Sequence, residues 1–422
     1  MAALDAAELL ALYAAGEATP LQVLQGVTER VARRNPEINA FATMNPAALH
    51  AARESTLRWQ AGQARALEGV PVTVSDLVDV AGLPTHRGSK TTDLTPARRD
   101  APLVAVLRAA GAVILGKTNV SEFGWKYQGD NPLFGITRNP WNPLHTAGGP
   151  SGGAAAAAAA FFAPLHIADG DICVTAAWNG VVGLNWGTMR EMQGIIARSV
   201  TDVALLSAVL KGGLRPDGLE DNVRGLKIGV LRRPGFAAAA SEDSWKAVSL
   251  AAEMLAGQGA ELSEMMPDLP AIDRIFSDLW GARRNRDLMA LSADQYTLLD
   301  PGLQALAVRF KAEPPCAESS VREADCAQAL QVMASLPVDI LLCPTISRNA
   351  PLAGGTIPDP LTALTQEWAP WTMLFSLTGQ PALTLPMGVD EEGLPTAVQI
   401  AARPGQEDVA LRVARAVERA LG

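Results

Sequence analysis

A glycine-rich turn followed by an unbroken run of alanine is the feature that most constrains the fold of this chain. The turn reads AGGPSGG over residues 147–153, and seven alanines follow it at residues 154–160. Alanine has the highest helix propensity, so the run predicts a helix that begins in the glycine turn. The run is too short to span a membrane, and its small side chains allow close packing. We therefore expect a buried helix inside a larger core.

Helix-like and strand-like segments alternate along the first half of the chain. Residues 4–60 have helical spacing, with a break expected at Asn35-Pro36. Residues 69–85 are β-branched and bounded by Gly and Pro, which predicts a buried strand and a loop. Residues 101–119 predict a helix and then a strand, whereas the Asn, Pro and Gly of residues 127–150 predict an irregular loop.

The second half continues the alternation, so the pattern predicts an α/β fold with a large, partly parallel sheet. Ser199 is a candidate N-cap for a helix, and residues 240–335 are mostly helical by pattern. Residues 338–345, 381–389 and 395–403 predict strands, and a last helix is expected from about Glu407. We find no internal repeat or long linker, and so expect one domain over residues 1–422. Its parts would be a core at about 60–200, a variable, mostly helical region at about 215–335, and C-terminal strands and a helix at 336–422 that return to the sheet.

Charge and cysteine content narrow the function classes. The net charge is −9 and no long basic run is present, which argues against a nucleic-acid partner. The four cysteines are scattered without a CxxC pair, a pattern typical of reduced thiols in a cytoplasmic protein. No apolar run is long enough for a membrane span. The acidic, amphipathic start of the chain favours a surface helix over a signal peptide.

Several strings, taken in order, resemble the amidase signature family of Ser–Ser–Lys amide hydrolases. The strings are NPEINAF, GVPVTVSDLVDVAGLPT, GAVILGKTNVSEFGW, NPLFGITRNPWNP, GGPSGG, GVVGL, DILLCPT, LTGQPALTLP and GLPTAVQI. The resemblance covers nearly the whole chain. It implies an α/β/α layered fold around a large mixed sheet, with a deep pocket at one edge of that sheet.

The family's chemistry uses a serine nucleophile, a second serine that relays a proton, and a neutral buried lysine that accepts it. In this chain Ser75 stands at the lysine position and Pro150 at the position of the relay serine. The segment from Ala163 to Gly183 is shorter than the family pattern, and either lacks the Gly-Gly-Ser oxyanion turn or carries Asp171 in place of the nucleophile. The chain after Gly187 is also shorter. The resemblance therefore implies that all three catalytic residues are absent.

Other residues near these positions could replace the missing groups, and each has a structural alternative. Ser151 follows Pro150 and is either a nucleophile or a helix N-cap. Cys173 stands where the family has an arginine, and its ICV context favours a buried, inert thiol in a strand. Ser75 is alternatively a small filler on a hydrophobic strand. Asp171 is an acid–base candidate or a solvated loop carboxylate, and Lys126 either reaches the pocket or lies on the surface.

Gly149 and three histidines complete the set of pocket candidates. His86, His145 and His166 flank the segments that carry the family motifs. Together with Asp169 and Asp171 they could form an acid–base set. Their spacing matches no metal motif, so we expect no metal and no cofactor, and a structural role is the alternative for each histidine.

Three functions remain open from the sequence. The first is an amidase-fold protein that has lost serine hydrolysis, a pseudoenzyme whose pocket is repurposed for a small molecule such as an amide or carboxylate, or for acid–base chemistry with Asp171 and a nearby histidine. The second is an amide hydrolase that uses displaced residues such as Ser151 or Cys173. The third is a non-catalytic subunit or regulator of an active amidase, with a protein partner or a second copy of itself.

Overall fold

The computed structural model describes residues 4–187, 192–211, 219–232, 239–312, 320–355 and 368–422. Over these residues 11 strands form one sheet in the order β1-β3-β2-β4-β6-β5-β10-β11-β9-β7-β8. The strands are β1 (Phe41–Met44), β2 (Pro71–Ser75), β3 (Val113–Thr118), β4 (Leu165–Asp169), β5 (Val182–Trp186), β6 (Gln193–Ala197), β7 (Lys227–Leu231), β8 (Glu261–Met265), β9 (Ile340–Pro344), β10 (Ala382–Val389) and β11 (Pro395–Ala402).

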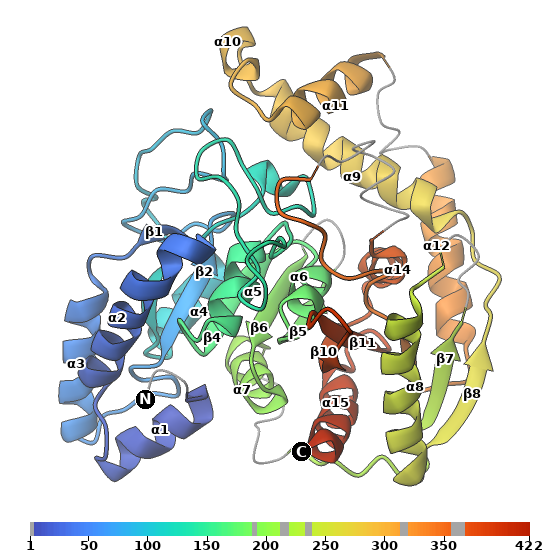
Figure 1. Ribbon diagram of the computed structural model, residues 1–422, viewed down its shortest axis with the longest axis horizontal. Coiled ribbons are helices and arrows are strands. Elements are labelled where there is room, and N and C mark those ends of the chain that lie inside the picture. The colour runs from blue at the N-terminus through green and yellow to red at the C-terminus, as the bar shows by residue number, and fades with distance from the viewer. Residues whose placement is uncertain (1–3, 188–191, 212–218, 233–238, 313–319, 356–367) are drawn as a thin grey trace.

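Helices flank this sheet along its whole length (Figure 1). The N-terminal half contains α1 (Ala6–Ala15), α2 (Pro20–Ile38), α3 (Ala48–Gln60), α4 (Pro102–Ala109), the 3₁₀ turn η1 (Glu122–Gly124), α5 (Gly152–Ala159), α6 (Cys173–Trp178) and α7 (Val200–Lys211). The C-terminal half contains α8 (Glu242–Gly257), α9 (Ile272–Met289), α10 (Ala293–Tyr296), α11 (Pro301–Ala312), α12 (Ser320–Ser335), α14 (Pro370–Thr378) and α15 (Glu407–Leu421). None of the described helices has the length and apolar character that a membrane crossing requires.

The sheet is mixed, as the sequence predicts. β2 runs parallel to both β3 and β4, and β7 runs parallel to both β8 and β9. The strands between these two parallel groups pair antiparallel. The α/β class with a large mixed sheet is therefore confirmed.

The alanine run forms α5, and its burial is as expected. Ala154 and Ala158 are completely buried, and the helix begins at Gly152 directly after the glycine turn. Gly153 shows how tight the packing is: a Cβ atom there would lie 2.5 Å from backbone atoms of Ala40 and Asn119. No side chain fits at such a distance, so this start of α5 requires glycine.

Most predicted elements are present, including β2, β3, β9, β10, β11 and the last helix from Glu407. The hydroxyl of Ser199 accepts a hydrogen bond from the backbone N–H of Asp202 at 3.3 Å, in agreement with its predicted capping role. The expected break at Asn35-Pro36 is wrong, because α2 continues to Ile38. It ends there because Asn39 adopts a left-handed conformation and its N–H donates to the carbonyl of Asn35.

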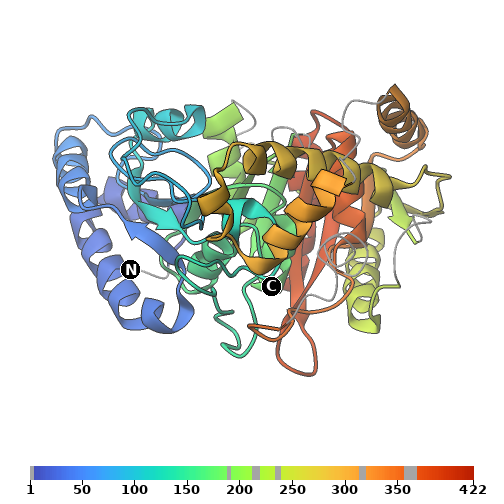
Figure 2. The same ribbon diagram turned by 90° about the horizontal axis from the view of Figure 1, so that it is seen from above.

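The longest excursion from the sheet is formed by α9, α10 and α11, which cross above one edge of the strands (Figures 1 and 2). Trp125 anchors α11, since its ring packs against Gly302, where a Cβ atom would lie 2.5 Å from the ring. Phe123, Leu303 and Phe310 belong to the same apolar cluster. This contact places α9 over the loops that leave β2, β3 and β4.

Candidate functional site

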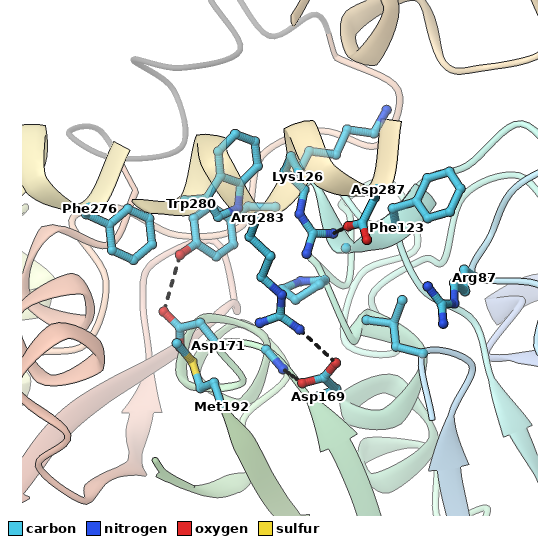
Figure 3. Close-up of a pocket in the computed structure, with 16 residues that line it drawn as sticks. Arg87, Phe123, Lys126, Asp169, Asp171, Met192, Phe276, Trp280, Arg283 and Asp287 are labelled. Atoms are coloured by element: carbon cyan, nitrogen blue, oxygen red, sulfur yellow. Dashed lines mark hydrogen bonds and ion pairs between the residues drawn. The ribbon is translucent and has the colours of Figure 1, made fainter. Parts of the chain in front are cut away.

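A pocket lies between the loops at the ends of β2 and β4 and the overlying α9 (Figure 3). Its cavity has a volume of about 190 Å³ and is partly open to solvent. The strand-end loops provide its floor and α9 its roof. Its lining residues are Leu77, Arg87, Phe123, Gly124, Lys126, Tyr127, Pro150, Asp169, Gly170, Asp171, Met192, Phe276, Trp280, Arg283, Arg284 and Asp287.

Asp171 lies on the pocket floor and is held by three hydrogen-bond donors. Its Oδ2 accepts from the Thr372 hydroxyl at 2.6 Å and from the Tyr127 hydroxyl at 3.2 Å, and its Oδ1 accepts from the backbone N–H of Cys173 at 3.0 Å. Burial raises the pKa of this carboxyl, and the three donors oppose that rise. The alternative of a solvated loop carboxylate is wrong, because the side chain is buried and fixed.

Asp169, at the end of β4, is the second carboxylate of the pocket. Its Oδ2 lies 3.5 Å from a guanidinium nitrogen of Arg283, and its Oδ1 accepts from the N–H of Gly170 at 2.9 Å. Burial raises its pKa, and Arg283 acts in the opposite direction. Gly170 has φ 87°, and a Cβ atom there would lie 2.7 Å from the Pro150 ring. The loop after β4 that contains Gly170 and Asp171, which we call the floor loop, therefore touches the turn before α5.

Ser75 and Ser151 hydrogen-bond to each other, with 3.2 Å between their hydroxyl oxygens. Both side chains are completely buried, and neither lines the pocket, whereas Pro150 does. Ser151 occupies the N-cap position of α5, but its side chain does not cap the helix; its hydroxyl donates to the carbonyl of Asp169 at 3.0 Å. The N-cap interpretation of this side chain is therefore wrong.

Gly149 is buried in the turn, and the Gly149–Pro150 peptide bond is cis. A Cβ atom on Gly149 would lie 2.3 Å from the carbonyl oxygen of Lys126. Lys126 itself is buried, with its ammonium 2.8 Å from Asp130 and 2.7 Å from Asp300. The surface-lysine interpretation is wrong, because these two carboxylates hold the amine in place while its stem lines the pocket.

The histidines do not join Asp171, which corrects the predicted acid–base set. Among the described residues that line the pocket there is no histidine. His166 is buried in β4, where Nδ1 lies 2.6 Å from the Thr73 hydroxyl and Nε2 lies 2.9 Å from the carbonyl of Ala163. Burial lowers its pKa to about 3, which fits the structural alternative.

The other two histidines are also outside the pocket. His86 lies 3.5 Å from Asp76 and packs edge-on against Phe134. His145 is hydrogen-bonded at 2.6 Å to the carbonyl of Ala350. In the described part of the chain no three His, Cys, Asp or Glu side chains are grouped so that they could hold a metal ion.

Cys173 lies at the start of α6, so the predicted strand is wrong. The apolar ICV letters fit a buried helix as well as a strand, and periodicity alone cannot separate the two over so few residues. The thiol is buried, faces the carbonyl of Ala382 at 3.7 Å and does not line the pocket. Burial raises its pKa, as expected for an inert thiol.

Sequence reasoning missed the α9 residues of the pocket, Phe276, Trp280, Arg283, Arg284 and Asp287. They lie in the region assigned only as variable and helical, where no motif marks them. The paired arginines of GARRNRD were the one available signal. Tyr127 and Thr372 were also missed, since they meet Asp171 from distant parts of the chain.

Comparison with known proteins connects this geometry to one family. The model of the family described as Amidase matches residues 22–411. A glutamyl-tRNA(Gln) amidotransferase subunit from Roseiflexus castenholzii is 31% identical, over 99% of this chain and 95% of the relative. The 6-aminohexanoate-cyclic-dimer hydrolase of Paenarthrobacter ureafaciens is 31% identical, over 99% and 94%.

The fold agrees with solved structures as well. A structure of 6-aminohexanoate cyclic dimer hydrolase superposes with a TM-score of 0.88 and 27% identity, and covers 100% of this chain and 97% of that one. The layered arrangement of helices around a mixed sheet is therefore shared along the full length of the chain.

Proposed function

This chain belongs to the amidase family, and we propose that it binds a small amide or carboxylate in the pocket without the serine hydrolysis typical of the family. The Ser75–Ser151 pair carries this proposal. Within the described part of the chain, the two hydroxyls hydrogen-bond only to each other and to backbone groups of Asp169 and Leu77. A serine attacks an amide only when a base accepts its proton, and none of these partners is a base at neutral pH.

Acid–base chemistry at Asp171 is the form of catalysis that the pocket supports best. The carboxyl faces the cavity, and burial raises its pKa, a shift that is common among carboxyls with acid–base roles. Hydrogen bonds from Tyr127 and Thr372 orient this carboxyl, whereas the sequence had suggested a histidine as its partner. A small molecule with a polar hydrogen at this point would be bound and polarised by Asp171.

A hydrolysis assay with an activity probe tests the proposal. We expect no turnover of aryl or alkyl amides and no labelling by a serine-directed fluorophosphonate. The relative from Paenarthrobacter ureafaciens, assayed on 6-aminohexanoate cyclic dimer, is the positive control. Removal of a single oxyanion donor costs about 10²–10³ in rate, and the resemblance implies that the nucleophile, relay and base are all altered here. Turnover that disappears in Ser151→Ala or Cys173→Ala would overturn the proposal.

The geometry does not favour a hydrolase with displaced residues. Cys173 is buried outside the pocket, and the hydroxyl of Ser151 points to the carbonyl of Asp169. Neither faces the cavity, so a substrate in the pocket would not meet either nucleophile without a rearrangement of the floor loop. The same assay decides between this alternative and the proposal.

The second candidate function is a role as one component of a larger protein assembly. For either function we propose a location in the cytoplasm. Several relatives carry the name of one component of a multi-subunit amidotransferase. Trp141, Leu144 and Leu352 are each more than half exposed, and a backbone hydrogen bond from the N–H of Ala353 to the carbonyl of Leu144 brings the segments of Leu144 and Leu352 together. Light scattering of the purified chain measures whether it is a monomer or a homodimer, and co-purification tests for another partner.

A further inference from the structure

The roof of the pocket carries one arginine, Arg284, whose charge the described residues leave incompletely matched. Arg284 of α9 is 7% exposed and lines the cavity. Among the described residues it makes no hydrogen bond, its Nε is buried without a partner, and its one ion pair is 3.4 Å long, to Asp287. A buried guanidinium normally forms several short hydrogen bonds, because its desolvation is costly.

Two more arginines surround the same space. Arg283, the neighbour of Arg284 on α9, reaches down to Asp169, as Figure 3 shows. Arg87 comes from the loop after β2 and lines the cavity at the end away from Asp171 (Figure 3). In the described part of the chain its guanidinium forms no ion pair. Burial and the like charges of Arg283 and Arg87 lower the pKa of Arg284 to about 10, although Asp287 opposes the shift.

The remaining cation of the lining is already matched. Lys126 is bound by Asp130 and Asp300, so its charge is not available to a ligand. Among the described residues, Arg87 and Arg284 are therefore the lining cations with the fewest polar partners. The lining also contains two aromatic side chains of α9, Trp280 and Phe276, which lie towards the Asp171 side of the pocket (Figure 3).

We propose that the ligand of this pocket is an anion, a carboxylate attached to an apolar or aromatic body, whose charged group binds between Arg284 and Arg87. Arginine suits this role, because its planar fork binds carboxylates in a fixed orientation. The body of the ligand lies against Trp280 and Phe276, and its far end reaches Asp171. This assignment rests on the proposed function, since it names the chemical class that the same pocket accepts.

A matched pair of probes tests the assignment by calorimetry. The probes are 3-phenylpropionate and 3-phenylpropionamide, which share shape and apolar body and differ in charge. We expect the carboxylate to bind at least about tenfold more tightly than the amide, the order of a charge-assisted hydrogen bond. Arg284→Met should abolish this preference, because it keeps an unbranched apolar stem and removes the charge. Arg284→Lys should keep part of it.

Controls separate this inference from the proposed function. Arg286→Met removes a charge from the exposed side of the same helix and should leave the preference intact. Equal binding of the two probes, a preference that survives Arg284→Met, or no binding of either probe at millimolar concentration would overturn the inference. Turnover of the amide would instead refute the loss of hydrolysis, and the affinity of the carboxylate would still measure the anion site. Circular dichroism of each variant verifies that it is folded.

Discussion

At the scale of single residues, position 75 is where we expect an attempt to build the family's catalytic lysine by substitution alone to fail. Ser75 is completely buried, and its hydroxyl lies 3.2 Å from that of Ser151, so a lysine there would displace its neighbours. Its amine would also lie close to the floor loop that carries Asp169. A nearby carboxylate favours the protonated amine, which cannot accept a proton from serine.

We therefore predict that Ser75→Lys, Pro150→Ser and Asp171→Ser together give no amide hydrolysis. The resemblance to the family implies a floor loop shorter than the family pattern, and substitutions cannot lengthen the backbone that would carry the oxyanion donors. A misplacement of about 1 Å can cost 10²-fold in rate. Insertion of Gly-Gly-Ser before Ile172, together with the changes at positions 75 and 150, is the version in which we expect measurable turnover. The measurement is release of a chromogenic amine, and activity of the triple variant without the insertion would show that the loop already has the hydrolase geometry.

At the scale of elements, the attachment of α1 to α7 depends on one buried carboxylate. Asp202 accepts hydrogen bonds from the backbone N–H groups of Ala6 at 2.7 Å and Ala7 at 3.1 Å. Burial raises the pKa of this carboxyl from 3.8 to about 7, an effect opposed by the two N–H donors. A raised folded-state pKa means that the folded protein binds the proton more tightly than the unfolded chain does.

The free energy of unfolding should therefore contain a contribution from Asp202 that is complete below about pH 4 and is lost as the pH rises to about 7. His166 contributes in the opposite direction, because its pKa is lowered to about 3 and its stabilisation is lost as the pH falls below 6.5. The difference between wild type and Asp202→Asn isolates the first contribution. We expect a weaker decline of the urea midpoint between pH 4 and 7 in Asp202→Asn, with exposed Glu253→Gln as the control. An identical pH profile in wild type and Asp202→Asn would contradict this assignment.

The elements also show which parts of the molecule a sequence can predict. α5 could be predicted from its own residues, because the alanine run and the glycines before it allow no other structure that packs well. The strands that end at Ser75 and Pro344 are recognisable by β-branched or aliphatic runs between turn residues. β8 was missed because its residues are mostly exposed and polar, so neither alternation nor a buried run marks it.

The site was harder to predict than the fold because its contacts are distant in the sequence. Pro150 and Asp171 were predicted from motifs, and both line the pocket. The roof comes from α9, more than a hundred residues later, and pairing across such a distance leaves no local pattern. The histidines near the motifs were misleading, because closeness to a motif in the sequence does not make a side chain face the pocket, and none of the three lines it. The segment after Gly187, which the resemblance implies is shortened, lies partly at residues 188–191, outside the described residues, as does Cys316.

At the scale of the whole molecule, the packing supports the proposal that residues 1–422 are one domain. The largest apolar cluster includes Ala6 near the N-terminus, Val200 in α7 and Val417 in the last helix. A side-chain carboxylate of α15, Glu418, accepts a hydrogen bond from the N–H of Val200 at 2.8 Å. The two ends of the chain thus share one core, and the sheet continues through both halves without an edge between them.

We therefore predict that the chain unfolds as one cooperative unit, and that damage at one end weakens the other. Val417→Ala removes two buried methyl groups from α15 and should cost about 2 kcal/mol of unfolding free energy. In urea below the midpoint, hydrogen exchange should then accelerate by the same factor in β3, in the N-terminal half, as in β11, next to α15, because both strands exchange through global unfolding. Far-UV circular dichroism and tryptophan fluorescence should give coincident transitions. An exposed substitution on the same helix, Arg419→Ala, is the control. Acceleration confined to β11 and its neighbours, or two separate transitions, would show instead that the C-terminal strands and helix form an independent unit.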